Sequence, residues 1–195
     1  MININSKTKL FLDMDNSLTN STKSFCESYN ILYKYHKDFK PANWEEVNEW
    51  NFGDQCPILK SETDVLEIFE TPIFFKLLKL INENTYEVTR ELNEKYYVII
   101  VSIGTPINLS RKTLYLQETL PFIKDYALLY NNGIKMNKEI IKMDYPESIF
   151  IDDHVSNLIS SNAVNKYVFG KDYPWSKTND YERLWNWTDV AKELL

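Results

Sequence analysis

The chain has 195 residues, of which 44% are hydrophobic and 14% aromatic, a composition that indicates a folded globular protein and excludes a disordered one. Its 22 basic and 28 acidic residues give a net charge of −6, which disfavours a protein that binds nucleic-acid polymers nonspecifically. The four glycines form no glycine-rich phosphate loop, so any phosphate must be held by another device.

The sequence shows no pattern typical of a signal peptide, a membrane span or a disulfide framework. The N-terminus lacks a basic and apolar signal pattern, and no apolar run approaches the about 18 residues of a membrane span. Cys26 and Cys56 are expected to be free thiols, because two cysteines without CxxC spacing more often remain reduced than form a disulfide. We therefore expect a cytoplasmic protein, a monomer or homodimer, that associates with no membrane.

The first predicted strand, Leu10–Asp13, is apolar and runs into the acidic sequence Asp13-Met14-Asp15. Residues two apart on a strand share a face, so both carboxylates can converge at the carboxyl end of a buried parallel strand. Two close carboxylates are best tolerated around a cation such as Mg²⁺, or where one is a nucleophile and the other an acid/base. The pair alone is equally compatible with a solvated turn or a calcium loop.

Residues 21–84 follow this strand and are rich in aromatic side chains. The stretch is far longer than one crossover helix requires, so we interpret it as a mostly helical insertion that folds as a small cap. The predicted domains are therefore an α/β catalytic core, made of residues 1–20 and 85–195, and a helical cap of residues 21–84.

Strands and helices alternate along the rest of the chain. The predicted helices are Thr85–Glu94, Pro106 to about Glu118, Val155–Ser161 and one helix or a pair of helices in Asp180–Leu195. The predicted strands are Tyr97–Ser102, Ser148–Asp152 and Lys166–Phe169, with a weaker one at Ala127–Tyr130. This order predicts an α/β fold: a Rossmann-like parallel sheet with helices on both faces, plus the cap inserted after the first strand.

Polar residues also end the later strands. Ser102 can donate to a phosphate oxygen, although a helix cap or turn is the commoner role of such a serine. The Asp152-Asp153 pair costs folding free energy unless cations or hydrogen-bond donors neutralise the two carboxylates, and a helix cap or solvated loop is the alternative interpretation.

A lysine lies between these strands. Lys138 could neutralise a nucleophilic aspartate and bind a phosphoryl group, although a surface position is the default for a single lysine.

Taken in order, these features resemble the four motifs of the haloacid dehalogenase-like phosphohydrolases. Within that superfamily the chain is similar to the 5′(3′)-deoxyribonucleotidase family, through Asp-Met-Asp, the insertion directly after it, Phe74-Phe75-Lys76-Leu77, Ile151-Asp152-Asp153-His154 with Asn157-Leu158, and the stretch from Arg183 to Asp189. Asn16 stands where the family often has glycine, although asparagine tolerates unusual backbone angles. Ser21 stands where the family often has an aromatic residue that stacks on the substrate.

The resemblance implies a role for each motif. Asp13 would be the nucleophile and Asp15 the acid/base, and Mg²⁺ would be held by Asp13, the backbone carbonyl of Asp15, and Asp152, with Asp153 as an outer or alternate ligand. The phosphoryl oxygens would be bound by Ser102, a lysine and backbone amides near Met14, Asn16 and Ile103. Lys138 precedes a β-branched pair as the family requires, whereas Lys142 has the more usual separation from Asp152. We favour Lys138 and explain its extra separation by an insertion around residues 145–147.

The resemblance also implies a phosphoric monoester hydrolase that uses Mg²⁺ and an aspartyl-phosphate to convert nucleoside monophosphates to nucleoside and phosphate. Phe75, Trp44 and Trp50 are candidates for contacting the base, with ordinary packing inside the cap as the alternative. Arg111 and Lys112 could approach the phosphate, but we interpret them as solvated helix charges. Two other functions stay open: the same chemistry on another small phosphomonoester, and a nucleotide-binding protein without catalysis.

Overall fold

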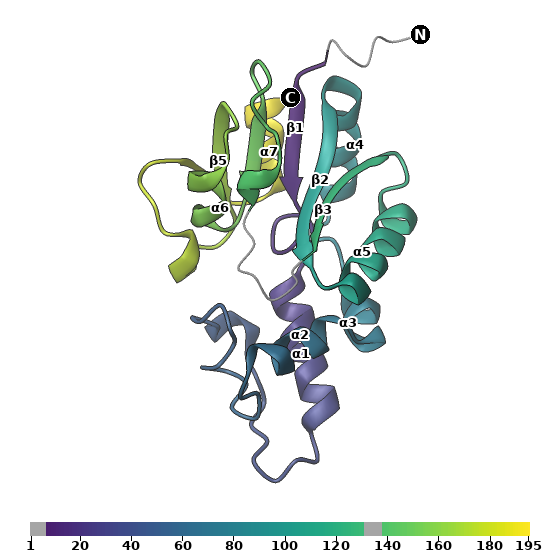
Figure 1. Cartoon of the computed structure of the whole chain (residues 1–195), viewed down its shortest axis with the longest axis vertical. Coiled ribbons are helices and arrows are strands. Elements are labelled where there is room, and N and C mark those ends of the chain that lie inside the picture. Colours follow the sequence, from purple (N-terminus) through teal and green to yellow (C-terminus); the bar gives the residue numbers. More distant parts are fainter. Residues whose placement is uncertain (1–6, 131–137) are drawn as a thin grey trace.

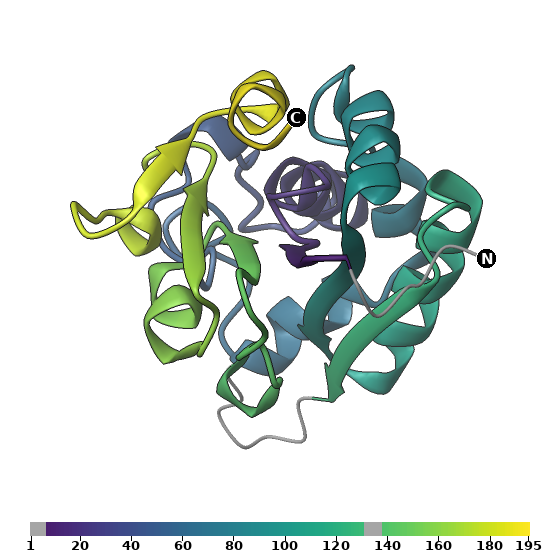
Figure 2. The ribbon, with the colours of Figure 1, turned by 90° about the horizontal axis from the view of Figure 1, so that it is seen from above.

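A computed structural model describes residues 7–130 and 138–195 and contains a six-stranded sheet in which every pairing is parallel. The strand order is β3-β2-β1-β4-β5-β6, so β1 lies in the middle (Figures 1 and 2). The strands are β1 (Lys9–Asp13), β2 (Tyr97–Gly104), β3 (Asp125–Tyr130), β4 (Ile149–Asp152), β5 (Asn165–Phe169) and β6 (Glu182–Leu184). The α/β, Rossmann-like fold predicted from the sequence is confirmed.

The alternating side chains of β1 pack into two cores, one on each face of the sheet. Leu10 and Leu12 join the larger core, which also contains residues of α4 (Thr85–Lys95), α5 (Pro106–Thr119) and α7 (Trp187–Leu194). Phe11 joins the smaller core with Leu158 of α6 (Val155–Ser160). Burial on both faces explains why β1 is apolar up to its acidic end.

The C-terminal segment differs from its prediction. Asp180–Leu195 was expected to be helical, but its first part is β6, which pairs with β5 through Tyr167 and Glu182, Val168 and Arg183, and Phe169 and Leu184. A three-residue strand leaves no periodic pattern, and its neighbour in the sheet decides its conformation. Helix α7 then begins after Asn186, whose side chain accepts from the amide of Thr188 at 2.8 Å.

The inserted segment, residues 21–84, lies beyond the carboxyl ends of the strands (Figure 1). Its elements are α1 (Ser21–Tyr33), the short 3₁₀ helix η2 (Trp44–Glu46), α2 (Glu62–Phe69) and α3 (Pro72–Leu77). The expectation of a mostly helical segment is wrong for residues 34–61, where η2 is the only helical element. Aromatic side chains from this irregular stretch pack against those of the helices: the ring of Phe52 stacks on Phe25 of α1 with centroids 3.9 Å apart.

The two links between the insert and the sheet run side by side. Thr19, on the outgoing link, forms an antiparallel bridge with Leu80 on the returning link. Two backbone hydrogen bonds flank this bridge, from the Asn20 amide to the Lys79 carbonyl at 3.0 Å and from the Ile81 amide to the Leu18 carbonyl at 2.9 Å. The insert therefore leaves and re-enters the core at one place.

Side-chain contacts hold the insert against the core on two sides. On the α5 side, Asn108 donates to the carbonyl of Phe69 at 2.8 Å. On the other side, the Trp50 ring meets His154 and Trp175 edge to face, with centroids 5.1 and 5.4 Å away. These contacts place the insert over the carboxyl edge of the sheet.

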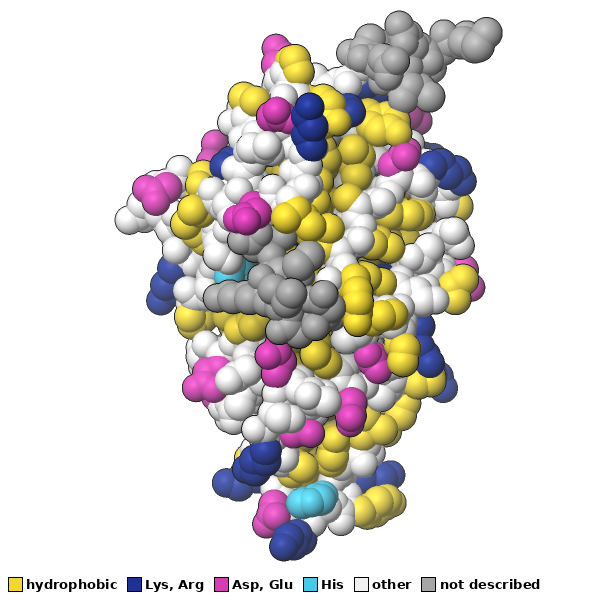
Figure 3. Space-filling view, viewed as in Figure 1, with side chains coloured by type: hydrophobic (Ala, Val, Ile, Leu, Met, Phe, Trp, Pro, Cys, Tyr) yellow, Lys and Arg dark blue, Asp and Glu magenta, His cyan; other side chains and the backbone are white. Residues whose placement is uncertain are grey.

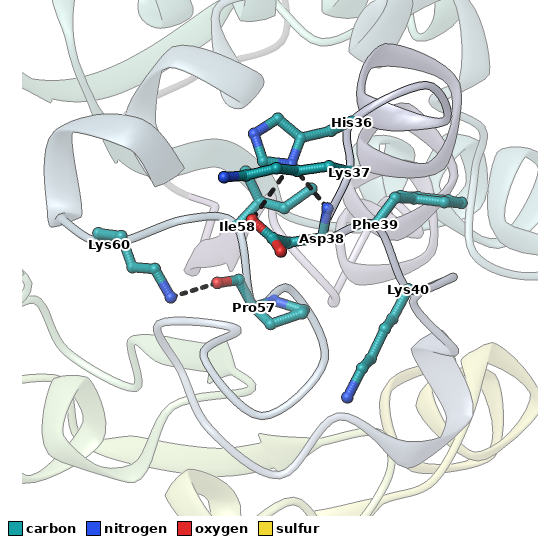
Figure 4. A pocket seen from close by; sticks show the side chains of 8 residues that line it. All are labelled: His36, Lys37, Asp38, Phe39, Lys40, Pro57, Ile58 and Lys60. Atoms are coloured by element: carbon teal, nitrogen blue, oxygen red, sulfur yellow. Dashed lines mark hydrogen bonds and ion pairs between the residues drawn. The ribbon is translucent and has the colours of Figure 1, made fainter.

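On the face shown in Figure 3, the Lys and Arg side chains are dispersed among acidic ones. A surface cavity of about 730 Å³ lies in the insert between residues 36–40 and 57–60 (Figure 4). His36 and Asp38 interact with each other there, and Lys60 donates to the carbonyl of Pro57 at 2.5 Å.

Among the described residues, no helix is both long and apolar enough to cross a membrane.

Candidate active site

The chain continues from β1 to β2 and β3 on one side of β1 and then crosses to β4, β5 and β6 on the other side. The carboxyl ends of β1, β2 and β4 meet at this change of direction. Ligand sites of open α/β sheets form at such a switch point. Asp13 ends β1, Ser102 lies near the end of β2, and Asp152 ends β4. All three side chains are buried, so the fold concentrates polar groups at one place inside an apolar sheet.

Lys138 joins this group from the short 3₁₀ helix η3 (Lys138–Ile140). Its buried ammonium forms an ion pair with Asp13 and another with Asp152, the latter at 2.6 Å. Lys142 instead leaves 71% of its side chain exposed, with its ammonium 3.9 Å from Asp144. Of the two candidate lysines, the structure thus brings Lys138 to the aspartates and leaves Lys142 at the surface.

Both aspartates at the end of β4 are fixed by hydrogen bonds. Asp152 accepts from the backbone amide of His154 at 2.8 Å and from the Asn157 side chain at 3.1 Å to each oxygen. Asp153 accepts from the Asn16 amide at 3.3 Å and from the Trp175 indole at 3.2 Å. These donors hold two neighbouring carboxylates in place despite their mutual repulsion.

Asp13, Asp152 and Asp153 form a cluster that fits a divalent cation. One carboxylate oxygen from each lies within 4.8 Å of the others. Within the described part of the chain, Oδ2 of Asp13 is buried and has no hydrogen-bond partner, which is costly for a carboxylate unless a cation binds it. Three carboxylates are the hard oxygen ligands that Mg²⁺ prefers.

The side chain of Asp15 points to a different set of partners. One oxygen accepts from Ser21 at 2.7 Å, and the other accepts from Lys112 and from Ser102, the latter at 3.3 Å. Burial would raise the pKa of Asp15, but the charge and hydrogen bond of Lys112, together with the hydrogen bond of Ser21 and the charge of Lys138, outweigh it, so this pKa lies below its ordinary value. A metal contact from Asp15 would therefore have to come from its backbone carbonyl, which stays a prediction.

Lys112 is the polar residue that sequence reasoning missed. Its interpretation as a solvated helix charge is wrong, because the side chain is only 2% exposed and reaches Asp15 and Ser102. The signal was present in the helical spacing: Leu109, Lys112 and Leu116 are the buried stripe of α5, three and four residues apart. Arg111, one position earlier, is half-buried.

The departures from the family pattern have structural explanations. Asn16 has a φ of 55°, the left-handed region that asparagine tolerates better than most residues, and its side-chain oxygen accepts from the Thr22 amide at 2.8 Å. Ser21 supplies a hydroxyl to Asp15 in place of an aromatic ring. The Met14 amide, by contrast, donates to the Val101 carbonyl at 3.2 Å and is engaged within the sheet. Phosphate binding by backbone amides near Met14 stays a prediction.

The predicted aromatic contacts divide into two groups. Trp44 and Phe75 are half-buried and pack against the larger core. Trp50 is 54% exposed and meets Trp175, whose indole is bonded to Asp153. Trp50 is thus the candidate that the structure brings near the acidic cluster.

Burial leaves two of the clustered carboxyls hard to ionise. Burial raises the pKa of Asp13 well above its ordinary value, against the opposing effect of Lys138. Burial and the charge of Asp152 raise the pKa of Asp153 to about 7. A cation bound among these groups would favour their charged forms.

This shift of Asp153 predicts how the metal-free protein responds to pH. Between its ordinary value of 3.8 and about 7, the folded chain keeps a proton that the unfolded chain has released, so stability falls as the pH rises through this interval. Urea unfolding in EDTA at several pH values should show this fall, and Asp153→Asn should make it shallower. Equal slopes for the two proteins would contradict the assignment to Asp153.

Comparisons with known proteins agree with the geometry. The family model described as 5′ nucleotidase, deoxy (pyrimidine), cytosolic type C protein matches residues 7–195. No curated protein matches the chain.

Solved structures share the fold at low sequence identity. A predicted phosphatase from Clostridium acetobutylicum is 14% identical, with a TM-score of 0.69 over 96% of this chain and 97% of that one. A haloacid dehalogenase-like hydrolase from Streptococcus pneumoniae is 14% identical, with a TM-score of 0.68 over 98% of this chain and 100% of that one. A hydrolase of the same superfamily from Bacillus subtilis, described as bound to magnesium, is 12% identical, with a TM-score of 0.62 over 96% and 98%.

The solved structures establish the fold, and the family match covers every residue that the structure describes. The chain therefore belongs to the family described as 5′ nucleotidase, deoxy (pyrimidine), cytosolic type C protein, within the phosphatases of the haloacid dehalogenase-like superfamily.

Proposed function

We propose that this phosphatase converts deoxyribonucleoside and ribonucleoside monophosphates to nucleoside and inorganic phosphate, through an aspartyl-phosphate on Asp13. The observation that carries the proposal is the buried carboxylate at the end of β1, which keeps one oxygen without a hydrogen-bond partner among the described residues. Such an oxygen can act as a nucleophile toward phosphorus. The nucleotide part of the proposal is supported by the family description.

In the first half of the proposed reaction, a carboxylate oxygen of Asp13 attacks phosphorus and the bond from phosphorus to the nucleoside oxygen breaks. Asp15 gives its proton to that departing oxygen. The free site favours ionised Asp15, but a phosphate dianion beside it raises its pKa by repulsion and so favours the protonated acid. Ser102 and Lys138 hold the phosphoryl oxygens and oppose their charge.

In the second half, water attacks the aspartyl-phosphate and Asp15 accepts the proton that the water loses. Inorganic phosphate leaves and the Asp13 carboxylate is restored. The proton that Asp15 accepts here restores the acid form that the first half of the next turnover needs. The insert over the carboxyl edge excludes bulk water and acts as the cap.

Asp13, Asp152 and Asp153 would hold Mg²⁺, with the Asp15 carbonyl as a further ligand. When bound, this ion supplies positive charge to the phosphoryl oxygens and favours the ionised form of the nucleophile. A cytoplasmic location is part of the proposal and is supported by the word cytosolic in the family description.

The test is phosphate release from dUMP, dTMP and other nucleoside monophosphates, compared with phosphoglycolate and sugar phosphates, with Mg²⁺ and with EDTA. We expect turnover of nucleoside monophosphates that requires Mg²⁺. Turnover of the other esters alone would overturn the substrate class and keep the chemistry. Tight Mg²⁺-dependent nucleotide binding without turnover would instead indicate a binding protein.

A further inference from the structure

Lys112 is a buried cation that the reaction proposed above does not use. It lies on α5, away from the strand ends that carry the family motifs, yet its ammonium reaches Asp15 and Ser102. A buried lysine is costly unless every charge and donor is satisfied. The hydrogen-bond partners of the Lys112 ammonium therefore indicate its role in the site.

The ammonium of Lys112 has three acceptors in the site. It donates to Asp15 Oδ2, to Ser102 Oγ at 2.8 Å and to the Ile103 carbonyl at 3.3 Å. A lysine ammonium has three N–H donors and no lone pair. Its donors are thus engaged within the protein, and the side chain is too deeply buried to meet a substrate directly.

The contact with Ser102 has a directional consequence. Because the ammonium cannot accept, Ser102 Oγ must be the acceptor in that contact, and its own hydrogen points to another acceptor, which in this structure is Asp15 Oδ2. Asp15 Oδ2 lies 3.3 Å from Ser102 Oγ, at the long end of hydrogen bonds between oxygens. A phosphoryl oxygen that binds at the ends of β1 and β2 would be a closer acceptor for this hydrogen.

We propose that Lys112 is a positioning residue that makes Ser102 an obligatory hydrogen-bond donor to the phosphoryl group and keeps the Asp15 carboxylate beside it. This inference rests on the proposed phosphatase function. The two buried lysines then have different roles. Lys138 forms ion pairs with Asp13 and Asp152, whereas Lys112 acts through Ser102 and Asp15. A purely structural counter-ion to Asp15 would not require the contact with Ser102.

The test is a double-mutant cycle of Lys112→Met and Ser102→Ala, read as kcat and KM for phosphate release. Removal of one positioned donor costs about 100-fold in kcat, and we expect that loss for Ser102→Ala. Lys112→Met should cost about 1,000-fold alone but only about 10-fold in the Ser102→Ala background, because much of its effect passes through the hydroxyl. Effects that multiply in the double variant would overturn the proposal.

Further variants keep the cycle interpretable. Lys112→Arg retains a cation with N–H donors and should stay within about 10-fold of the wild type in kcat, whereas a loss as large as that of Lys112→Met would overturn the proposal. If Lys112→Met fails to fold, Lys112→Gln, which removes the charge but keeps a polar end, takes its place in the cycle. Arg111→Met, the adjacent position on α5, is the control and should keep wild-type kcat and KM.

The same cycle is measured by equilibrium binding of inorganic phosphate in the presence of Mg²⁺, which does not need turnover. Lys112→Met and Ser102→Ala should each weaken this binding, and their effects should again fail to multiply. An inactive wild type that binds phosphate with this coupling would refute the proposed function alone. An active wild type without the coupling would refute the role of Lys112 alone.

Discussion

Asp13→Asn is expected to lower kcat for phosphate release by at least about 1,000-fold, in the range found when a catalytic nucleophile is removed. The amide has nearly the same shape as the carboxylate, but it cannot form an aspartyl-phosphate. The variant should still fold, because the pKa of Asp13 is raised by burial and by its acidic neighbours, so a neutral side chain suits this position. Steady-state and single-turnover phosphate release measure the loss.

Asp144→Asn is the matched control for this prediction. Asp144 is half-exposed, in the loop after η3, and pairs only loosely with Lys142 at 3.9 Å. The kcat of the Asp144→Asn variant should stay at the wild-type value, since surface substitutions of this kind change activity and stability little. Phosphatase activity that survives in Asp13→Asn would remove the aspartyl-phosphate from the mechanism.

Lys138→Met is expected to damage both activity and stability. Without the ammonium, Asp13 and Asp152 are left as unpaired carboxylates in a buried site. Removing one partner of a buried ion pair typically costs about 3–5 kcal/mol in the free energy of unfolding. We expect this loss in urea titrations at pH 8 in EDTA, together with a fall in kcat of about 100-fold or more.

Mg²⁺ should restore part of the lost stability, because a cation bound by the same carboxylates replaces the missing positive charge. Lys142→Met is the matched control four residues away, and its free energy of unfolding should stay within about 0.5 kcal/mol of the wild type. Equal effects of the two substitutions would show that Lys138 has no special part in the site.

The sequence was most informative where one strand determines the position of a side chain. Asp13, Ser102 and Asp152 each follow a buried apolar run, and parallel strands bring such ends together. Lys138 lies in no strand, and the β-branched pair after it was the only local indication. The structure assembles these four residues at the switch point of the sheet.

The sequence was least informative where packing between distant segments decides the outcome. Lys112 lies within the buried stripe of α5, but a charged residue at such a position is normally excluded from a core. Its contacts with Asp15 and Ser102 make its burial possible. β6 depends on its pairing with β5. The irregular residues 34–61 are held by packing of the insert core, which leaves no periodic pattern.

The paired links at Thr19 and Leu80 have a mechanical consequence. Helix α1 begins immediately after the outgoing link, and its first turn is bonded to the loop after β1 through Ser21 to Asp15 and through the Thr22 amide to Asn16. A tilt of α1 would therefore act directly on Asp15 and on Asn16, whose side chain donates to Asp153. If the insert opens by tilting α1, the side chain of Asp15 would be displaced in the same movement.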